Sequence, residues 1–388
     1  MNLRFLTAGE SHGPALTAIL EGLPAGLPLA PEEIAIDLAR RQSGAGSGGR
    51  MAIEQDRAQI LAGVMEGRTT GAPLTLLIPN RDHANWQGKA VPAFTIPRPG
   101  HADLAASIKY GYDDIRLSLE RASARETAAR VAVGAVCRKY LSMFGIEIGG
   151  WVSSIGGVNA DTRRMLLSNC VAAARASDVS CPDPDAAALM RAAIHQAGEQ
   201  GETLGGIVEG VATGLPVGLG SHVHWDRKLT SRLAAALMSI PAVKGVEIGE
   251  AFAVAAQSGT QAQDAIRADG NRIVRTSNRC GGIEGGISNG QPILVRVAIK
   301  PIPTTRKTQA SVNLSNGEPV STRYERSDVC PVPRAVPVIE AVLAHVLADA
   351  VLEKLGGDSL SEQLPRFAQL RQPALDQIQM TDHPHVFW

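Results

Sequence analysis

The chain has 388 residues, of which 44% are hydrophobic, which is enough for one large core or two smaller ones. Basic and acidic residues balance at 38 each, so no overall field would attract nucleic acid or a membrane, and any basic site must be local. The five cysteines form no Cys-x-x-Cys pair, which is typical of reduced thiols in the cytosol. The N-terminal apolar stretch is too short for a signal peptide, and no run approaches the roughly 18 apolar residues of a membrane span. We therefore expect a cytoplasmic protein that binds neither nucleic acid nor a membrane.

Helices and strands interleave along the chain without regular βαβ spacing. Residues 31–41 begin with proline and acids and end with basic side chains, which suits a helix dipole. The pattern Ser-Ala-Arg-Glu at 123–126 predicts a capping box that opens a helix reaching about residue 144. Further helices are expected over residues 185–197, 226–239 and 333–355, and strands over 3–6, 74–78, 206–211 and 293–299. This succession indicates an α+β fold with mostly antiparallel sheets over a helical layer.

One segment of the chain is echoed later. Gly-Glu-Ser-His-Gly at 9–13 is followed by Glu-Gly and Gly-Leu-Pro, and Gly-Glu-Thr-Leu-Gly at 201–205 is followed by the same two motifs. The echo favours a duplicated structural unit, although chance in a glycine-rich chain would also produce it. If the unit is duplicated, the second copy has no histidine, so the chemistry would lie in the first copy.

Three short motifs carry candidate chemistry near the N-terminal half. His12 follows a strand-like run and lies between small residues, where a ligand could reach it, and histidine is the natural acid or base near neutral pH. Arg98 and His101 lie three residues apart on a Pro-Gly turn, and arginine suits phosphate or carboxylate. Arg121 and Arg125 flank the helix start at Ser123, where backbone N–H groups favour an anion.

Two further motifs lie in the C-terminal half. The glycine-rich segment 280–290, followed by Lys-Pro-Ile-Pro-Thr at 300–304, allows close backbone approach to a phosphate or a flat ring. It contains neither a Walker loop nor a dinucleotide fingerprint. Arg326 and Asp328 lie two residues apart and would serve as an anion clamp and a proton acceptor, or form a surface ion pair.

Other site classes have less support. The His-x-His pairs at 222/224 and 383/385 have no nearby ligands at metal-site spacing, so we predict no metal. A hydrolase triad assembled from Ser11, His101 and Asp328 would be without a Gly-x-Ser-x-Gly elbow. The motifs together predict a site for a multiply anionic, phosphorylated small molecule, with acid–base groups.

At this point the sequence resembles the chorismate synthase family. The resemblance rests on ordered motifs: Gly-Glu-Ser-His-Gly with Glu-Gly-Leu-Pro at 21–24, Arg-Pro-Gly-His-Ala-Asp-Leu at 98–104, Glu-Arg-Ala-Ser-Ala-Arg-Glu-Thr at 120–127, residues 238–249, Gly-Gly-Ile-Ser-Asn-Gly at 285–290, and Arg-Ser-Asp-Val-Cys at 326–330 leading to Glu340. It implies a β-α-β sandwich, with helices between antiparallel sheets and an internal pseudo-two-fold duplication. Residues 1–356 would form a single domain, and 357–388 a C-terminal tail of unassigned role. Members are similar in forming homotetramers.

The resemblance also implies a reaction and a cofactor. Family members are lyases that remove phosphate and a ring proton from 5-enolpyruvylshikimate-3-phosphate by 1,4-anti elimination, giving chorismate, the last common step of the shikimate pathway to aromatic amino acids. Reduced FMN is required without net redox change. NADPH would enter only as an electron source, and a separate flavin reductase is an alternative source.

Site roles follow from the resemblance, residue by residue. His12 would protonate the departing phosphate, His101 would hold the reduced flavin in its reactive form, and Asp328 would assist proton removal. The positions matching substrate-binding residues are Ser11, Arg41, Arg50, Arg98, Arg125 and Arg326. Those matching FMN-contacting positions are Arg121, Ala122, Ser123, Gly285, Lys300, Pro301, Ile302, Pro303, Thr304 and Arg326.

The chain departs from the family pattern in the loop between Arg41 and Arg50. Ser47 stands where a further arginine is usual, and Ala45 where many members have an aromatic residue. The departure leaves open a non-catalytic protein that binds flavin or a phosphorylated ligand on the same scaffold. An ordinary flavin oxidoreductase is a third alternative, but no dinucleotide motif supports it.

Overall fold

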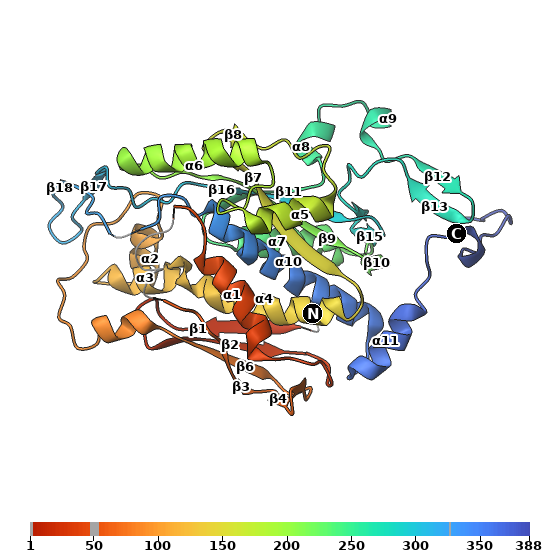
Figure 1. Cartoon of the computed structure of the whole chain (residues 1–388), viewed down its shortest axis with the longest axis horizontal. Coiled ribbons are helices and arrows are strands. Elements are labelled where there is room, and N and C mark those ends of the chain that lie inside the picture. Colours follow the sequence, from red (N-terminus) through yellow and green to blue (C-terminus); the bar gives the residue numbers. More distant parts are fainter. Residues whose placement is uncertain (1–2, 47–53, 326) are drawn as a thin grey trace.

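The computed structural model describes residues 3–46, 54–325 and 327–388 of the chain. Its body has a layer of helices between two antiparallel sheets, as Figure 1 shows, with one sheet below the helices in that view and the other above them. The predicted α+β class and the sandwich of sheets around helices are therefore confirmed.

The first sheet holds four strands in the order β1-β2-β6-β3, all antiparallel. Their bounds are Arg4–Ala8, Ala15–Glu21, Leu74–Pro79 and Gln59–Ala62. Side chains alternate along β6, so that Leu74, Leu76 and Ile78 are buried against the helices. On the opposite face Leu6 and Ile19 are exposed.

The second sheet has the order β11-β16-β9-β7-β8, again antiparallel throughout. The bounds are Val243–Ile248, Ile293–Ile299, Gly206–Thr213, Glu147–Ile155 and Val158–Asn159. Strand β7 is buried on both faces, because α10 covers one side while α5 (Leu167–Ala176) packs Cys170 and Ala174 against Trp151 on the other. Helix α6 (Pro184–Glu199) also lies on this outer side (Figure 1).

The two sheets repeat one topology. When β8, at one edge of the second sheet, is left out, each sheet has four strands that lie in the order first, second, fourth, third along the chain. A helix follows the second strand in both halves, namely α1 (Pro31–Gln42) and α7 (Leu229–Met238), and a longer one follows the fourth, namely α4 (Thr127–Ser142) and α10 (Val332–Leu355). The echoed motifs at 9–13 and 201–205 both lead into the second strand of their half. This correspondence agrees with the predicted internal duplication.

The long helices α4 and α10 cross at the centre of the molecule. Their contact is close because Gly134 faces Ala341, and a Cβ on Gly134 would lie 2.2 Å from the Ala341 Cβ. Arg40 of α1 reaches Glu340 of α10 with Nη1–Oε2 and Nη2–Oε1 distances of 2.5 and 2.9 Å. These contacts fix α1, α4 and α10 relative to one another.

The expectation that no apolar run approaches the length of a membrane span was wrong for α10. This helix is long and apolar enough to cross a membrane by length and composition, which the sequence analysis did not recognise. Its side chains are almost all buried between the two sheets, so it occupies the position of a core helix.

Two predicted helix starts also needed correction. The helix expected from residue 226 begins at Leu229, because Trp225–Arg227 form a 3-10 turn and Lys228 is extended. Ser123 does accept a hydrogen bond from the Arg125 N–H, but Glu126 does not complete a capping box. Its carboxylate binds Thr7 and Arg130 instead.

The remaining elements lie at the ends of the body. Helices α2 (Asp103–Tyr110) and α3 (Arg116–Ala122) and the hairpin β17–β18 (Ala310–Val312, Pro319–Ser321) lie at one end in Figure 1. At the other end are α8 (Ala251–Val254), α9 (Gly259–Ala262), the hairpin β12–β13 (Ile266–Asp269, Arg272–Arg275) and the C-terminus. Smaller strands are β4–β5 (Val64–Met65, Arg68–Thr69) and the sheet β10-β15-β14 (Val217–Gly220, Ile287–Asn289, Ile283–Glu284).

The tail after residue 356 packs on the body in two places. In α11 (Leu360–Ala368), Gln363 is buried and accepts a hydrogen bond from the Tyr140 hydroxyl at 2.8 Å. Farther on, Pro373 accepts a hydrogen bond from the Ile273 N–H of β13. The tail therefore follows the surface of the body before its exposed last residues.

Candidate active site

His12 lies on the tight turn between β1 and β2. Gly9 opens this turn with φ +110°, and a Cβ there would lie 2.4 Å from the Ala15 carbonyl oxygen, so only glycine fits. The His12 ring nitrogen Nδ1 lies 2.6 Å from Glu120 Oε1 of α3. The ring also packs on Trp86, with centroids 4.4 Å apart.

The Arg-Pro-Gly-His turn forms a second histidine–carboxylate pair. Asp103, fully buried at the start of α2, accepts hydrogen bonds from Arg98 Nε at 2.8 Å and Nη2 at 2.9 Å, and its Oδ1 contacts His101 Nδ1. Burial alone would raise the pKa of Asp103, but the hydrogen bonds from His101 and Arg98 outweigh it and hold the pKa well below its usual range. The buried Arg98 therefore anchors His101 through a shared carboxylate.

Arg41 and Arg125 lie side by side in the interior, with Asp56 between them. Asp56 Oδ1 and Oδ2 lie 2.6 and 2.8 Å from Arg125 Nη1, and Oδ2 lies 3.4 Å from Arg41 Nη1. Burial lowers the pKa of Arg41 to about 10, with Asp56 opposing this change and the cations Arg334 and Arg125 adding to it. Two guanidiniums are thus held together in a buried, charged site.

Asn80 connects this arginine pair to the turn that carries His12. Its side-chain oxygen accepts a hydrogen bond from Arg125 Nε at 2.9 Å, and its amide donates to the carbonyl oxygens of Glu10 and Gly13. Ser11 is buried at the same place and donates to Ser123 Oγ at 3.1 Å. The predicted residues Ser11, His12, Arg41, Ser123 and Arg125 are therefore brought together.

Asp328 lies just before α10 and pairs with Arg334 of that helix. Its Oδ2 lies 2.7 Å from Arg334 Nη1, and both residues are close enough to Arg41 to affect its pKa. The neighbouring Ser327 donates to the Thr304 carbonyl oxygen, and the Thr304 hydroxyl accepts from Arg98. Arg50 and Arg326, together with Ser47, lie outside the described residues.

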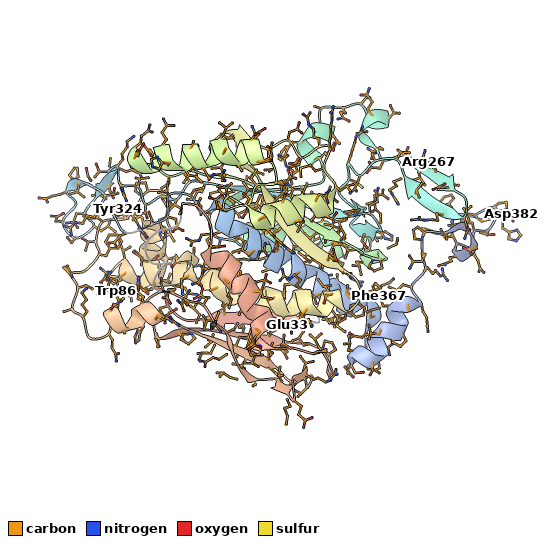
Figure 2. All side chains as sticks on the ribbon, viewed as in Figure 1. Glu33, Trp86, Arg267, Tyr324, Phe367 and Asp382 are labelled. Atoms are coloured by element: carbon orange, nitrogen blue, oxygen red, sulfur yellow. The ribbon has the colours of Figure 1, made fainter. Side chains whose placement is uncertain are left out.

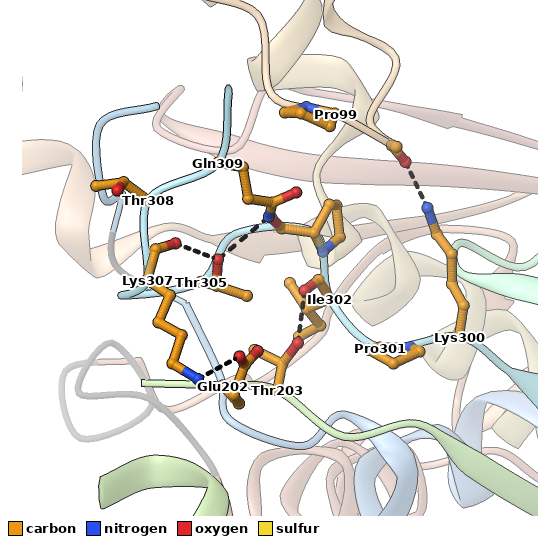
Figure 3. Close-up of a pocket in the computed structure, with 12 residues that line it drawn as sticks. Pro99, Glu202, Thr203, Lys300, Pro301, Ile302, Thr305, Lys307, Thr308 and Gln309 are labelled. Atoms are coloured by element: carbon orange, nitrogen blue, oxygen red, sulfur yellow. Dashed lines mark hydrogen bonds and ion pairs between the residues drawn. The ribbon is translucent and has the colours of Figure 1, made fainter. Parts of the chain in front are cut away.

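A cavity of about 620 Å³ opens beside the Arg98–His101 turn (Figure 3). Lys300, Pro301, Ile302 and Pro303 line it, and the Lys300 ammonium donates to the Gly100 carbonyl oxygen. Burial, and the neighbouring Lys244, lower the pKa of Lys300. The second echoed motif contributes Glu202 and Thr203 to the wall, so both copies reach this end of the molecule.

A second cavity, of about 390 Å³, lies beside the loop that precedes β11. Arg121, Ala122 and Ser123 line it together with Pro241. The next residue, Ala242, accepts a hydrogen bond from the N–H of Lys300, which lines the first cavity, so this loop connects residues of the two cavities. Figure 2 places Trp86 and Tyr324 toward this end of the molecule, and Arg267 and Asp382 toward the other.

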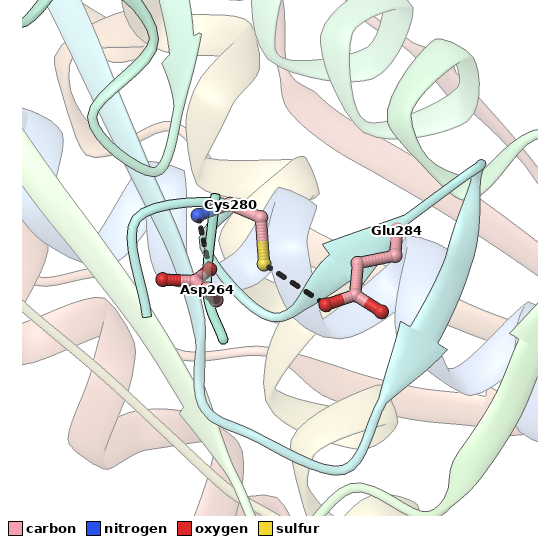
Figure 4. Close-up of side chains that lie close together, drawn as sticks. All are labelled: Asp264, Cys280 and Glu284. Atoms are coloured by element: carbon pink, nitrogen blue, oxygen red, sulfur yellow. Dashed lines mark hydrogen bonds between the residues drawn. The ribbon is translucent and has the colours of Figure 1, made fainter. Parts of the chain in front are cut away.

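Gly285 is the predicted flavin-contacting residue that lies apart from these cavities. Gly285 and Gly286 form the β14–β15 turn, and Gly286 packs on Lys228, just before the start of α7. Pro241, which lines the second cavity, follows the opposite end of that helix. In the nearby cluster of Asp264, Cys280 and Glu284 (Figure 4), three atoms that could ligate a metal lie within 4.8 Å of one another.

Each side chain of that cluster already has protein partners. Asp264 accepts hydrogen bonds from the Arg279 and Cys280 N–H groups, and Glu284 forms a two-pronged ion pair with Arg275 at 2.6 Å. Burial and the carboxylates raise the pKa of the Cys280 thiol to about 11. A metal would have to displace these partners, so the cluster supports no metal site.

Sequence reasoning missed the residues that hold the site together: Glu54, Asp56, Asn80, Asp103, Glu120 and Arg334. Of these residues, only Glu54 and Asp56 could have been recognised from a pattern in the sequence. Acids two residues apart in an extended segment point to the same side, and here both side chains face Arg125.

The fold and the site define an internally duplicated α+β sandwich whose one end gathers buried arginines, two histidine–carboxylate pairs and two cavities. Such a site suits a small, multiply anionic ligand and acid–base chemistry. The family model described as chorismate synthase matches residues 3–352. The chain is 54% identical over 377 residues to a chorismate synthase of Geobacter sulfurreducens, covering 93% of this chain and 96% of that protein.

Two further relatives agree. A chorismate synthase of Desulforudis audaxviator is 55% identical, with 93% of this chain and 95% of the relative covered. A solved structure titled "Crystal Structure of Chorismate Synthase" matches with a TM-score of 0.78 and 45% identity over 95% of this chain and 97% of its own. The chain therefore belongs to the chorismate synthase family.

Proposed function

We propose that this chain converts 5-enolpyruvylshikimate-3-phosphate to chorismate by 1,4-anti elimination of phosphate and a ring proton, with reduced FMN as cofactor. Its place in the family supports the reaction. The structural observation that carries the proposal is a pair of buried guanidiniums beside His12 and Asp328: Arg125 Nη2 and Arg334 Nε have no hydrogen-bond partner among the described residues. Buried N–H donors without acceptors are costly, and the oxygens of an anionic substrate would satisfy them.

The described residues fit a flavin as well. The cavities at Lys300 and at Arg121 have the size of small-molecule sites, and their walls combine prolines and other apolar groups with cations that suit a flat ring and a phosphate. When bound, reduced FMN would supply transient electron density that weakens the carbon–oxygen bond of the substrate. Gly285 does not line either cavity, so its role toward FMN stays a prediction.

The protein's own groups would then divide the proton chemistry. His12 delivers a proton to the departing phosphate, Asp328 assists removal of the ring proton, and His101, held by Asp103, maintains the flavin in its reactive form. Arg41, Arg98 and Arg125 offset the charge of the substrate. Arg125 is paired with Asp56 and Arg98 with Asp103, and these pairs fix the directions in which the guanidiniums offer their N–H groups to the substrate.

The finer parts of the proposal concern the setting of the enzyme. We infer a cytoplasmic homotetramer whose FMN is reduced by a separate flavin reductase. NADPH would act only as an electron source.

An anaerobic assay tests the function. Purified protein, dithionite-reduced FMN in catalytic amount and 5-enolpyruvylshikimate-3-phosphate should give chorismate and phosphate in equal amounts, without net consumption of reductant. Tight binding of flavin and substrate without product would instead favour the non-catalytic alternative. Consumption of one reductant per turnover would favour an oxidoreductase.

A further inference from the structure

Glu120, near the end of α3, contacts the Ser11–His12 dipeptide three times. Its carbonyl oxygen accepts a hydrogen bond from the Ser11 N–H at 3.1 Å. Its carboxylate oxygen Oε2 accepts from the His12 N–H at 2.7 Å, and Oε1 lies 2.6 Å from His12 Nδ1. One residue therefore holds both the backbone and the ring of His12.

These contacts restrict how the imidazole can move. Hydrogen bonds to a carboxylate are short and strong, and a carboxylate on one ring nitrogen fixes the orientation and the tautomer of a histidine. Trp86 packs on the ring, so rotation about the side-chain bonds is limited from a second direction. Because Glu120 engages Nδ1, a proton given to a reacting group has to come from Nε2.

We propose that Glu120 is the positioning residue of His12, holding Nδ1 so that Nε2 delivers the proton to the departing phosphate. The inference rests on the proposed function and deepens it, since Glu120 acts through His12 rather than on the substrate. The competing account is that Glu120 only braces the β1–β2 turn. The two accounts differ in what happens when His12 is already absent.

A double-mutant cycle separates them. Glu120→Gln keeps the size of the side chain, but its amide offers a single acceptor oxygen to two donors, the His12 N–H and Nδ1–H. Glu353→Gln is a matched control, because Glu353 is half-exposed near the C-terminal end of α10, whereas the site lies at the other end of that helix. Phosphate release would be followed anaerobically in wild type, Glu120→Gln, Glu353→Gln, His12→Ala and the Glu120→Gln/His12→Ala pair.

We expect Glu120→Gln to lower kcat by about 10- to 100-fold, the range seen when a carboxylate that orients a metal-ligating histidine is lost, with KM changed less than kcat. Added to His12→Ala, it should cost nothing further, because a residue that acts through His12 has nothing left to position. The same fold loss in both backgrounds, or unchanged kcat in the single variant, would overturn the proposal. Failure of wild type and Glu353→Gln to release phosphate would instead reject the proposed function.

A readout independent of turnover completes the test. In ¹⁵N-labelled protein the ring resonances of His12, assigned by their loss in His12→Ala, should show a proton on Nδ1 in the wild type. They should change in Glu120→Gln and stay unchanged in Glu353→Gln. His12 resonances that are identical in wild type and Glu120→Gln would contradict the assignment even if the enzyme proved inactive.

Discussion

Asp103 accepts two hydrogen bonds from the guanidinium of Arg98, at 2.8 Å from Nε and 2.9 Å from Nη2. The same carboxylate receives the Arg98 backbone N–H at 3.0 Å and contacts His101. Neither arginine nor histidine in this motif is thus an isolated ligand-binding group. The acid, which sequence reasoning did not single out, determines where both of them point.

Replacing Asp103 by Asn should destabilise the protein at pH 7 by about 3 to 5 kcal/mol, because it leaves the buried Arg98 charge uncompensated. The pKa of Asp103 in the folded protein is depressed, so its contribution is present above the unfolded-state pKa near 4 and lost as pH falls through the folded-state value. Urea unfolding of both proteins should give a constant difference in free energy from pH 7 to about 5. The difference should then narrow as the pH falls below about 4, whereas a difference that stays constant at that lower pH would show that the pKa of Asp103 is not depressed.

Much of the secondary structure was predictable from local signals. Proline and acids at the start of α1 and basic residues at its end placed that helix to within one residue, and β16 was predicted with its observed bounds. The predicted start of α7 was wrong, because no local sequence signal distinguishes the 3-10 turn at Trp225–Arg227 from a first helical turn. Local propensity thus set the elements but not all their ends.

The residues that build the site were less predictable, since their partners are far away in the sequence. His12 and Glu120 are 108 positions apart, and Arg40 and Glu340 are 300 apart. Motifs identified groups able to do chemistry, such as His12 and Arg125. Their counterions depend on tertiary packing between segments far apart in the sequence, which a single sequence does not reveal through periodicity. Only the spacing of Glu54 and Asp56 gave a local hint.

Gly134→Ala tests the crossing of α4 and α10. In an exposed helix this change would stabilise by about 1 kcal/mol. Here the new Cβ would lie 2.2 Å from the Ala341 Cβ, so the helices must separate and we expect destabilisation of about 1 to 3 kcal/mol. The control is Gly198→Ala in α6, where the nearest atom would be the Val329 Cγ2 at 3.6 Å. Thermal unfolding should show a lower Tm for the first variant only; equal Tm values would show that the crossing can relax.

Glu340→Gln tests the ion pairs between the central helices. Glu340 is buried and neutralises Arg40, and Arg138 lies 3.7 Å from the same carboxylate. We expect a loss of about 1.5 to 3 kcal/mol in the free energy of unfolding, because the charge-assisted hydrogen bonds to Glu340 are lost while Arg40 keeps its ion pair with Asp37. Asp161→Asn, which removes the exposed pair with Arg163, should leave stability unchanged. Similar effects in both variants would mean that the buried network contributes no more than a surface pair.

The most direct test of the account is anaerobic phosphate release by wild type, His12→Ala, His101→Ala and Asp328→Asn, with His195→Ala as the control. His195 is exposed on α6 and lines neither cavity. The wild type and the control should release phosphate and chorismate in equal amounts. The three site variants should release phosphate about 10²- to 10⁴-fold more slowly, because this is the usual contribution of a positioned acid or base. They should still fold. Release at the wild-type rate by His12→Ala would contradict the assignment of this end of the molecule as the active site.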